Sequence, residues 1–163
     1  MALYELVKWG PTSFNCFPLR VAFVVTPAAK ARLFPLLSES NRTKAAGAPA
    51  IAIIGYDTRF YDQMPRLFPG RDLRSEFVDK PRFAETTAFR NGSLQGVYFI
   101  LAARALGLDC GPMSGFDNEA VDREFFSGAG VKSNFLCSIG YGDPTGLRER
   151  FPRPRFGEVC SVL

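Results

Sequence analysis

Small and apolar residues follow a helical period through the middle of the chain, from Pro81 to about Gly107. One face of this predicted helix carries residues at i, i+3, i+4 and i+7 spacing: Leu94, Val97, Tyr98, Leu101 and Ala105. A second stripe lies on another side of the helix: Phe89, Ser93, Gly96, Ile100 and Ala103. Because so much of the circumference is small or apolar, the pattern predicts a long helix buried inside a domain or in a dimer.

The ends of this helix are marked by residues that commonly start and stop helices. Asp79 and Pro81 suit the start, and Gly107 suits the left-handed position just past the end. Residues 110–116 then read Cys-Gly-Pro-Met-Ser-Gly-Phe. Because glycine lets the main chain approach a ligand closely, we interpret this stretch as a loop that presents its backbone to a flat ligand.

Three shorter apolar runs predict β-strands at residues 19–25, 49–56 and 134–141. The second run is apolar almost throughout, which is typical of a strand that is buried on both faces. The strands do not alternate regularly with helices. The sequence therefore predicts an α+β layer architecture rather than a series of βαβ units.

Further helices are predicted at residues 1–9, at residues 27–37 after a Thr26 cap, and up to residue 126 after an Asp117 cap. The helix at residues 1–9 has no capping residue before it. Residues 57–80 are rich in aromatics, prolines and charges and show no clear period. A segment of this kind is either an insertion with short helices or a lid over a site, and the sequence leaves both interpretations open.

The composition predicts one folded domain that spans residues 1–163, with 47% hydrophobic and 22% charged residues. The sixteen phenylalanines indicate a heavily aromatic core, a minority being available for a flat-ligand site or a dimer interface. The N-terminus has no charged region followed by an apolar stretch, and no window reaches a membrane-spanning length. We therefore expect a cytoplasmic protein with no membrane partner.

The net charge of +4 and the isoelectric point near 9.0 raise the possibility of nucleic-acid binding. The basic residues are scattered rather than arranged in a stripe, however, so we expect no nucleic-acid partner. The local exception is the arginine group in the tail: Arg148, Arg150, Arg153 and Arg155. These arginines belong either to a solvated tail or to a phosphate-binding site, and both interpretations stay open.

The chain contains no histidine and four cysteines without a C-x-x-C pair. The absence of histidine excludes Ser-His-Asp and Cys-His nucleophiles, histidine acid–base catalysis and His-ligated zinc. The cysteine spacing argues against a disulfide framework or a zinc knuckle, so we expect no metal. A bound cofactor that carries the reaction itself would account for catalysis in such a chain.

Two short polar motifs are candidates for contacts with such a cofactor. The turn-rich segment 8–18 presents Ser13 and Asn15, either as an ordinary connecting loop or as hydrogen-bonding groups for a ring. Asn41 and Lys44 are three residues apart, so on one helical turn they point the same way.

Together with the residue 106–117 stretch, these motifs resemble the FMN-dependent nitroreductase superfamily, and within it the malonic semialdehyde reductases of pyrimidine catabolism. The segment from Lys8 to Cys16 resembles the loop that contacts the isoalloxazine ring, by analogy through Ser13 and Asn15. Asn41 and Lys44 resemble the pair beside the pyrimidine edge of the flavin. Two further matches are the reactive-edge loop and a C-terminal phosphate-binding residue: Pro112, Met113, Ser114 and Gly115, and Arg153.

The resemblance implies a mainly antiparallel central sheet flanked by helices, a long central helix and a domain-intertwined homodimer with sites at the subunit interface. It implies an FMN-dependent NAD(P)H oxidoreductase in which hydride passes from NADPH or NADH to the flavin and on to the substrate in a ping-pong cycle. The implied reaction reduces malonic semialdehyde to 3-hydroxypropionate, or else nitroaromatics or quinones. No catalytic side chain is implied, because the flavin carries the chemistry.

Within this resemblance, a Lys44 ammonium would stabilise the negative charge of the reduced ring, and the backbone amides of Ser114 and Gly115 would bind its reactive edge. Arg153 would pair with the terminal phosphate. If the substrate is a semialdehyde acid, Arg66 or Arg71 is expected to pair with its carboxylate.

The chain departs from the family pattern at two places. Many nitroreductases carry an acidic residue where Ser114 stands, whereas the malonic semialdehyde reductase branch resembles this chain there. Family members also begin with an extra helical segment whose basic residues grip the phosphate, and this chain starts after it. We therefore expect either a fragment or a compact variant. The competing hypothesis is an inactive remnant that acts as a flavin-binding or interaction protein.

Overall fold

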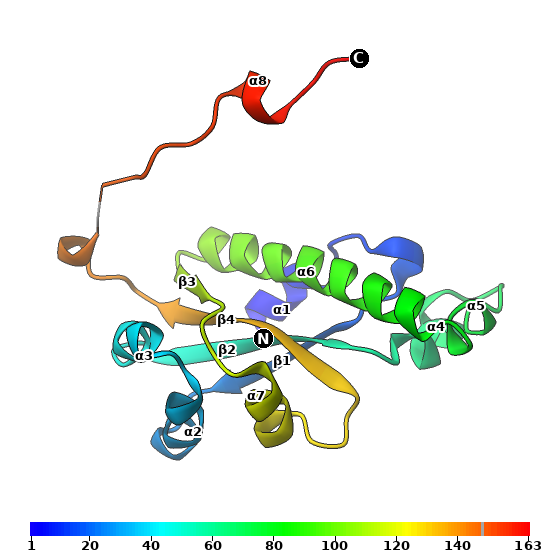
Figure 1. The fold of residues 1–163 in the computed structure, drawn as a ribbon, viewed down its shortest axis with the longest axis horizontal. Coiled ribbons are helices and arrows are strands. Elements are labelled where there is room, and N and C mark those ends of the chain that lie inside the picture. The colour runs from blue at the N-terminus through cyan, green and yellow to red at the C-terminus, as the bar shows by residue number, and fades with distance from the viewer. Residues whose placement is uncertain (148) are drawn as a thin grey trace.

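Four antiparallel strands form the central sheet of the computed structural model, which describes residues 1–147 and 149–163 (Figure 1). The spatial order is β1-β2-β4-β3, so β1 and β3 are the two edges. The strands span Leu19–Val24 (β1), Ala50–Asp57 (β2), Asp109–Met113 (β3) and Val131–Gly140 (β4). This arrangement confirms the predicted nitroreductase-like α+β fold with a mainly antiparallel sheet.

Helices cover both faces of the sheet, and the strand residues alternate between them (Figure 1). Helices α1 (Ala2–Val7) and α6 (Pro81–Ala105) pack on one face, where Ala52 and Ile54 contact Phe99. Helices α2 (Pro27–Leu33), α3 (Glu39–Ala45) and α7 (Asn118–Phe125) cover the other face over Ile51 and Ile53. Strand β2 is therefore buried on both faces, as the sequence predicts.

The predicted helix caps are present. The Thr26 hydroxyl accepts a hydrogen bond from the Ala29 N–H at 3.2 Å, and the Asp117 carboxylate accepts one from the Ala120 N–H at 3.0 Å. Gly107 follows the end of α6 with a φ of +80°. The helix predicted for residues 27–37 ends early, because Pro35 lies in a 3₁₀ turn, η2 (Phe34–Leu36), that continues α2.

Strand β3 corrects the prediction of three strands and of a loop that begins at Cys110. Gly111 and Pro112 favour a loop when the sequence is read alone. In the structure they lie on an edge strand, whose outer side needs no ladder hydrogen bond, so proline is tolerated there. Strand β4 also begins at Val131, three residues before the predicted start.

The orientation of α6 differs from the prediction of a buried helix. Within one chain its inward side is small and polar, with Asn91 and Gln95 at 1% and 0% exposure. Leu94, Val97 and Leu101 instead face outward, with 42%, 51% and 60% of their surfaces exposed. The prediction that this stripe is buried inside the domain is wrong, and its burial in a dimer stays a prediction.

Residues 57–80 form short helices, which is the first of the two interpretations that the sequence left open. They are η3 (Phe60–Gln63), α4 (Met64–Leu67) and α5 (Ser75–Val78). The rings of Phe60 and Phe77 meet edge to face at 4.9 Å, and Met64 is fully buried with them. This cluster packs on Ala84 and Ala88 at the start of α6, so the segment has its own small apolar core.

The C-terminal segment extends away from the sheet (Figure 1). It contains η4 (Pro144–Gly146) and α8 (Phe156–Val159). Its large apolar side chains are exposed: Leu147, Phe151, Phe156, Val159, Val162 and Leu163. Across the described residues, no helix combines the length and apolar character needed to cross a bilayer.

Candidate flavin site

The N-terminal half of α3 is joined to the end of β3 through the carbonyl oxygen of Gly115. Asn41 Nδ2 donates to this oxygen at 3.1 Å, and the Ser38 N–H donates to it at 2.9 Å. A Cβ atom on residue 115 would lie 2.6 Å from Asn41 Nδ2 and from Ser38 Oγ, so any other residue would displace these two polar groups. Asn41 is buried, whereas Lys44, one turn later on α3, is exposed.

The predicted reactive-edge loop continues from this junction. Pro112 and Met113 end the edge strand β3, and Ser114 and Gly115 follow it. The N–H groups of Ser114 and Gly115 donate to no other residue within the described part of the chain. The structure thus brings Asn41, Lys44 and this loop to one end of the sheet, with free backbone donors beside them.

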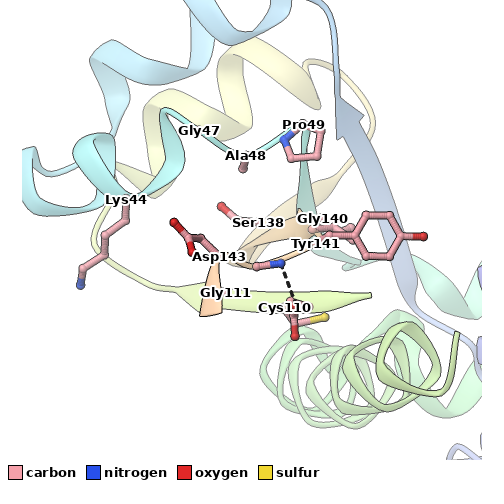
Figure 2. A pocket seen from close by; sticks show the side chains of 13 residues that line it. Lys44, Gly47, Ala48, Pro49, Cys110, Gly111, Ser138, Gly140, Tyr141 and Asp143 are labelled. Carbon is pink, nitrogen blue, oxygen red and sulfur yellow. Dashed lines mark hydrogen bonds between the residues drawn. The ribbon is translucent and has the colours of Figure 1, made fainter. Parts of the chain in front are cut away.

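A cavity of about 440 Å³ lies between α3, β3 and the end of β4. Figure 2 shows Lys44 on one side of it and the Gly140–Tyr141 turn on the other, with the Ser138 hydroxyl between them. The Ser138 Oγ atom is buried and has no hydrogen-bond partner among residues 1–147 and 149–163. An unpaired buried hydroxyl costs free energy, so a ligand that bonds to it would be stabilised there.

The two carboxylates of this cavity are already engaged by the protein. Asp109 pairs with Arg104 and accepts a hydrogen bond from the Gly142 N–H at 2.7 Å, the dashed line in Figure 2. The hydroxyl and N–H of Thr145 hydrogen-bond Asp143 and lower the pKa of its carboxyl. Lys44 has no carboxylate partner within the described residues, so its positive charge is available to a ligand.

The turn that holds Ser13 and Asn15 packs on α6, whereas Asn41 and Lys44 belong to α3, and these two helices lie on opposite faces of the sheet (Figure 1). Ser13 and Asn15 form a 3₁₀ turn, η1 (Ser13–Asn15), that packs against α6 through a 2.8 Å hydrogen bond from the Ser13 N–H to Asn91 Oδ1. Asn15 Nδ2 donates to the Leu67 carbonyl at 2.8 Å. One chain therefore holds the predicted flavin contacts as two separate groups.

The second group borders a cavity of about 690 Å³ that Asn15 and Arg66 line together with Lys8, Trp9 and Arg20. Lys8 and Arg20 are paired with Glu5 and Asp57, both at 2.5 Å. The Arg66 guanidinium has one hydrogen bond to the described residues, to the Gln63 side-chain oxygen at 3.4 Å, and no carboxylate partner among them. Of the two predicted substrate residues, Arg66 faces this cavity with Asn15.

Arg71, the other predicted substrate residue, is exposed and pairs with Glu76 at 3.4 Å. The predicted phosphate residue Arg153 lies in the extended C-terminal segment, where it donates to the carbonyl oxygens of Phe151 and Pro152 at 2.9 and 3.2 Å. Arg148 falls outside the described residues. Neither Arg71 nor Arg153 lines the 440 Å³ cavity in one chain.

All four cysteines are thiols, and burial raises the pKa of Cys16 to about 11. The described residues contain no group of three or more His, Cys, Asp or Glu side chains arranged to hold a metal ion. Sequence analysis missed Ser138, Asn91 and Gln95 as candidates. In the sequence, each of these residues is marked only as a polar residue within an otherwise apolar strand or helix face. Such a residue does not by itself indicate a site.

Two comparisons of sequence identify related proteins. The Nitroreductase family profile matches residues 1–142. A protein from Leptothrix cholodnii with the provisional name NADH dehydrogenase/NAD(P)H nitroreductase is 56% identical over 162 residues, which cover 99% of this chain and 82% of that protein. A relative from Ralstonia pickettii with the same provisional name and the symbol HadB is 51% identical, over 98% of this chain and 83% of its own.

Solved structures share the fold at lower identity. The Bacillus subtilis protein ydfN, which has the provisional name nitroreductase, superposes with a TM-score of 0.85 at 23% identity, over 99% of this chain and 86% of its own. A nitroreductase-like protein from Exiguobacterium sibiricum, solved in complex with FMN, gives a TM-score of 0.83 at 20% identity, over 99% of this chain and 84% of its own.

Proposed function

Because the chain belongs to the nitroreductase family, we propose that it is an FMN-dependent NAD(P)H oxidoreductase that reduces a small electron-poor acceptor. The observation that carries this proposal is the α3–β3 junction. There Lys44, which has no carboxylate partner among the described residues, lines a ligand-sized cavity, and Asn41 on the same helix holds the loop that carries the free backbone N–H groups. Such a set suits an electron-rich ring with hydrogen-bonding edges.

The residues of the 440 Å³ cavity fit FMN. Its volume is within the range of small-molecule sites, and the unpaired Ser138 hydroxyl and the Lys44 ammonium offer donors to a polar ligand. Lys44, Gly111 and Ser138 line this cavity, and Asn41 and the Pro112–Gly115 loop, which lie next to Lys44 and Gly111 along the chain, would help to hold the ring. When bound, FMN would supply hydride transfer between a nicotinamide donor and the acceptor, for which this histidine-free chain has no side-chain substitute.

Lys44 would stabilise the negative charge that accumulates beside it, since a fixed ammonium needs no reorganisation when that charge appears. Asn41 keeps its own position through the Gly115 carbonyl, which fixes the turn of α3 that carries Lys44. The backbone N–H groups of Ser114 and Gly115 would donate to the ring edge. These roles need no proton-transferring side chain.

We propose further that the complete site forms between two copies of the chain. Ser13 and Asn15 lie on the other face of the sheet from the α3–β3 junction, so one chain cannot present both groups to one ring. The exposed apolar stripe of α6 and the projecting C-terminal segment provide surfaces for pairing. A homodimer would place the 13–15 turn of one copy beside Lys44 of the other.

The acceptor that we favour is malonic semialdehyde, with reduction to 3-hydroxypropionate, and nitroaromatics or quinones as other acceptors. Support comes from Arg66, which lines the 690 Å³ cavity beside Asn15 and has no carboxylate partner among described residues. A guanidinium binds a carboxylate in a planar, bidentate manner. Arg71 is the weaker candidate because Glu76 already pairs with it.

The test of the proposed function is the visible spectrum of the purified protein, followed by acid release and chromatographic identification of the flavin. We expect a yellow protein that releases about one FMN per chain and is bleached by NADPH or NADH under anaerobic conditions. A colourless, folded protein that takes up no added FMN would overturn the proposal and favour an inactive remnant. FMN uptake without reduction by either nicotinamide would favour a flavin-binding protein without turnover.

A further inference from the structure

Helix α6 holds the residue 10–19 loop through three polar side chains on one stripe. Asn91 Oδ1 accepts from the Ser13 N–H at 2.8 Å, and Gln95 Oε1 accepts from the Leu19 N–H at 2.9 Å. The Tyr98 hydroxyl donates to the Pro11 carbonyl at 3.1 Å. Asn91, Gln95 and Tyr98 are spaced i, i+4 and i+7, so successive turns of one helix bind the middle, the end and the beginning of the loop.

The loop needs such support because its backbone is strained. Phe14, Asn15 and Phe17 have φ values of 52°, 53° and 42°, in the left-handed region that L-residues rarely adopt. Three such residues within four positions persist only where the surroundings determine the conformation. This strained turn is the one that presents Ser13 and Asn15.

The two amides are poorly explained by core packing alone. Asn91 and Gln95 are 1% and 0% exposed, and Gln95 Nε2 has no hydrogen-bond partner among the described residues. A leucine at residue 95 would remove this orphaned donor but would leave the Leu19 N–H without its acceptor. The Gln95 side chain therefore supplies a hydrogen bond to the loop, although it leaves a buried donor without a partner in the core.

Close packing adds to the hydrogen bonds at the start of the loop. The Tyr98 ring lies so near Gly10 that a Cβ atom there would come within 2.0 Å of it. The ring therefore occupies the space of a side chain at residue 10. Helix α6 therefore holds the loop by close packing at Gly10 as well as by hydrogen bonds.

We infer that Asn91, Gln95 and Tyr98 are positioning residues that keep the 10–19 loop in the conformation that contacts the flavin. The inference rests on the proposed function, because it assigns to Ser13 and Asn15 the contact with the ring. These three side chains act through the loop and need not touch the cofactor themselves. Their loss should weaken FMN binding through the loop, with the α3–β3 junction left intact.

The test compares Asn91→Leu with Asn134→Leu. Asn134 Nδ2 bonds Ser93 Oγ on the same helix at 2.8 Å, so the control also removes one α6 hydrogen bond but none to the loop. Hydrogen exchange of the Ser13 amide is measured against amides of β2, which report global opening. We expect exchange at Ser13 to rise at least tenfold in Asn91→Leu alone, and the FMN dissociation constant to rise by a similar factor.

Two further variants keep the test decisive. Asn91 Nδ2 also donates to the Thr87 carbonyl at 2.9 Å, so Asn91→Asp is measured at a pH where the buried carboxyl is protonated. It then keeps an acceptor for the Ser13 N–H and a donor for Thr87, and should recover most of the FMN affinity that Asn91→Leu loses. If Asn91→Leu does not fold, Tyr98→Phe removes only the hydroxyl that bonds Pro11 and should raise the dissociation constant a few-fold.

The outcomes separate this inference from the proposed function. If the wild-type chain binds no FMN, the proposed function fails, and the positioning role fails with it even when Ser13 exchange responds as expected. If the wild type binds FMN but the loop variants and Asn134→Leu have the same affinity, the positioning role alone is wrong. An unchanged Ser13 exchange rate in Asn91→Leu would also overturn it.

Discussion

The side-chain amide of Asn41 donates to the carbonyl oxygen of Gly115 across 74 residues of sequence, at 3.1 Å. This bond, with the Ser38 N–H bond to the same oxygen, ties α3 to the end of β3. Lys44 on α3 and the backbone donors of Ser114 therefore form one rigid arrangement. The geometry of the proposed site depends on a contact that neither element makes by itself.

Gly115→Ala tests that contact. The new methyl group would lie 2.6 Å from Asn41 Nδ2 and Ser38 Oγ, so the Ser38 hydroxyl must rotate and the Asn41 amide must move from its place on the Gly115 carbonyl. We expect a loss of about 1–3 kcal/mol in the free energy of unfolding, measured by urea denaturation, together with weaker FMN binding in a fluorescence titration. Gly157→Ala is the control, because a Cβ atom there has open space around it. Equal FMN affinity in both variants would separate the junction from flavin binding.

Lys44→Met tests the charge that adjoins the cavity. Methionine keeps most of the side-chain length and removes the ammonium, so we expect flavin reduction by NAD(P)H to slow about tenfold or more in stopped-flow measurements. Lys80→Met is the matched control, since Lys80 pairs with Glu76 on the surface at 3.7 Å and lines no proposed site. A normal reduction rate in Lys44→Met would remove this residue from the proposed mechanism.

The elements that the sequence predicts well are those with strong local signals. Thr26 and Asp117 cap helices, and the apolar runs at β1 and β2 become strands because their patterns need no tertiary context. Strand β3 was missed because Gly111 and Pro112 normally interrupt strands, and only its place at the sheet edge makes them acceptable. The edge position is a property of the whole sheet, which local pattern does not encode.

The sequence predicts which residues are candidates for the site, but it does not predict where the fold places them relative to one another. Asn41 and Lys44 share α3 as their spacing predicts, yet Ser13 and Asn15 lie beyond the sheet in the same chain. No local pattern states which face a loop will occupy. The sequence likewise does not predict that Leu94 and Leu101 face outward. An apolar stripe that packs on the core and one that faces outward have the same helical period.

Arg66→Ala and Arg71→Ala compare the two predicted substrate residues. Arg66 adjoins the cavity that Asn15 lines, whereas Arg71 is paired with Glu76. We expect Arg66→Ala to raise KM for a carboxylate-bearing semialdehyde about tenfold, and to leave KM for an uncharged quinone unchanged. Arg71→Ala should match the wild type with both acceptors. If neither variant loses affinity for the acid, both assignments are wrong.

The thiols should differ in their reaction with a disulfide reagent at pH 8. Burial raises the pKa of Cys16 to about 11, and burial together with the adjacent Cys110 raises that of Cys137 to about 12. A raised thiol pKa reduces the thiolate fraction, which is the reactive form. We expect exposed Cys160 to react rapidly, and Cys16 and Cys137 to react only after unfolding. Cys160→Ser is the control and should abolish the fast phase; a fast phase from Cys16 would contradict the burial.

Leu101→Glu tests pairing through the outward face of α6. Leu101 is 60% exposed in one chain and lies on the same stripe as Val97. If two copies bury this stripe, a carboxylate there would lose its hydration, so we expect the variant to sediment as a monomer where the wild type sediments as a dimer. Ser127→Glu, on the loop after α7, adds the same charge on the other face and should remain dimeric. Because the proposed ring contacts come from two copies, the monomeric variant should also lose FMN. A monomer that retains full FMN affinity would show that one chain suffices for the site.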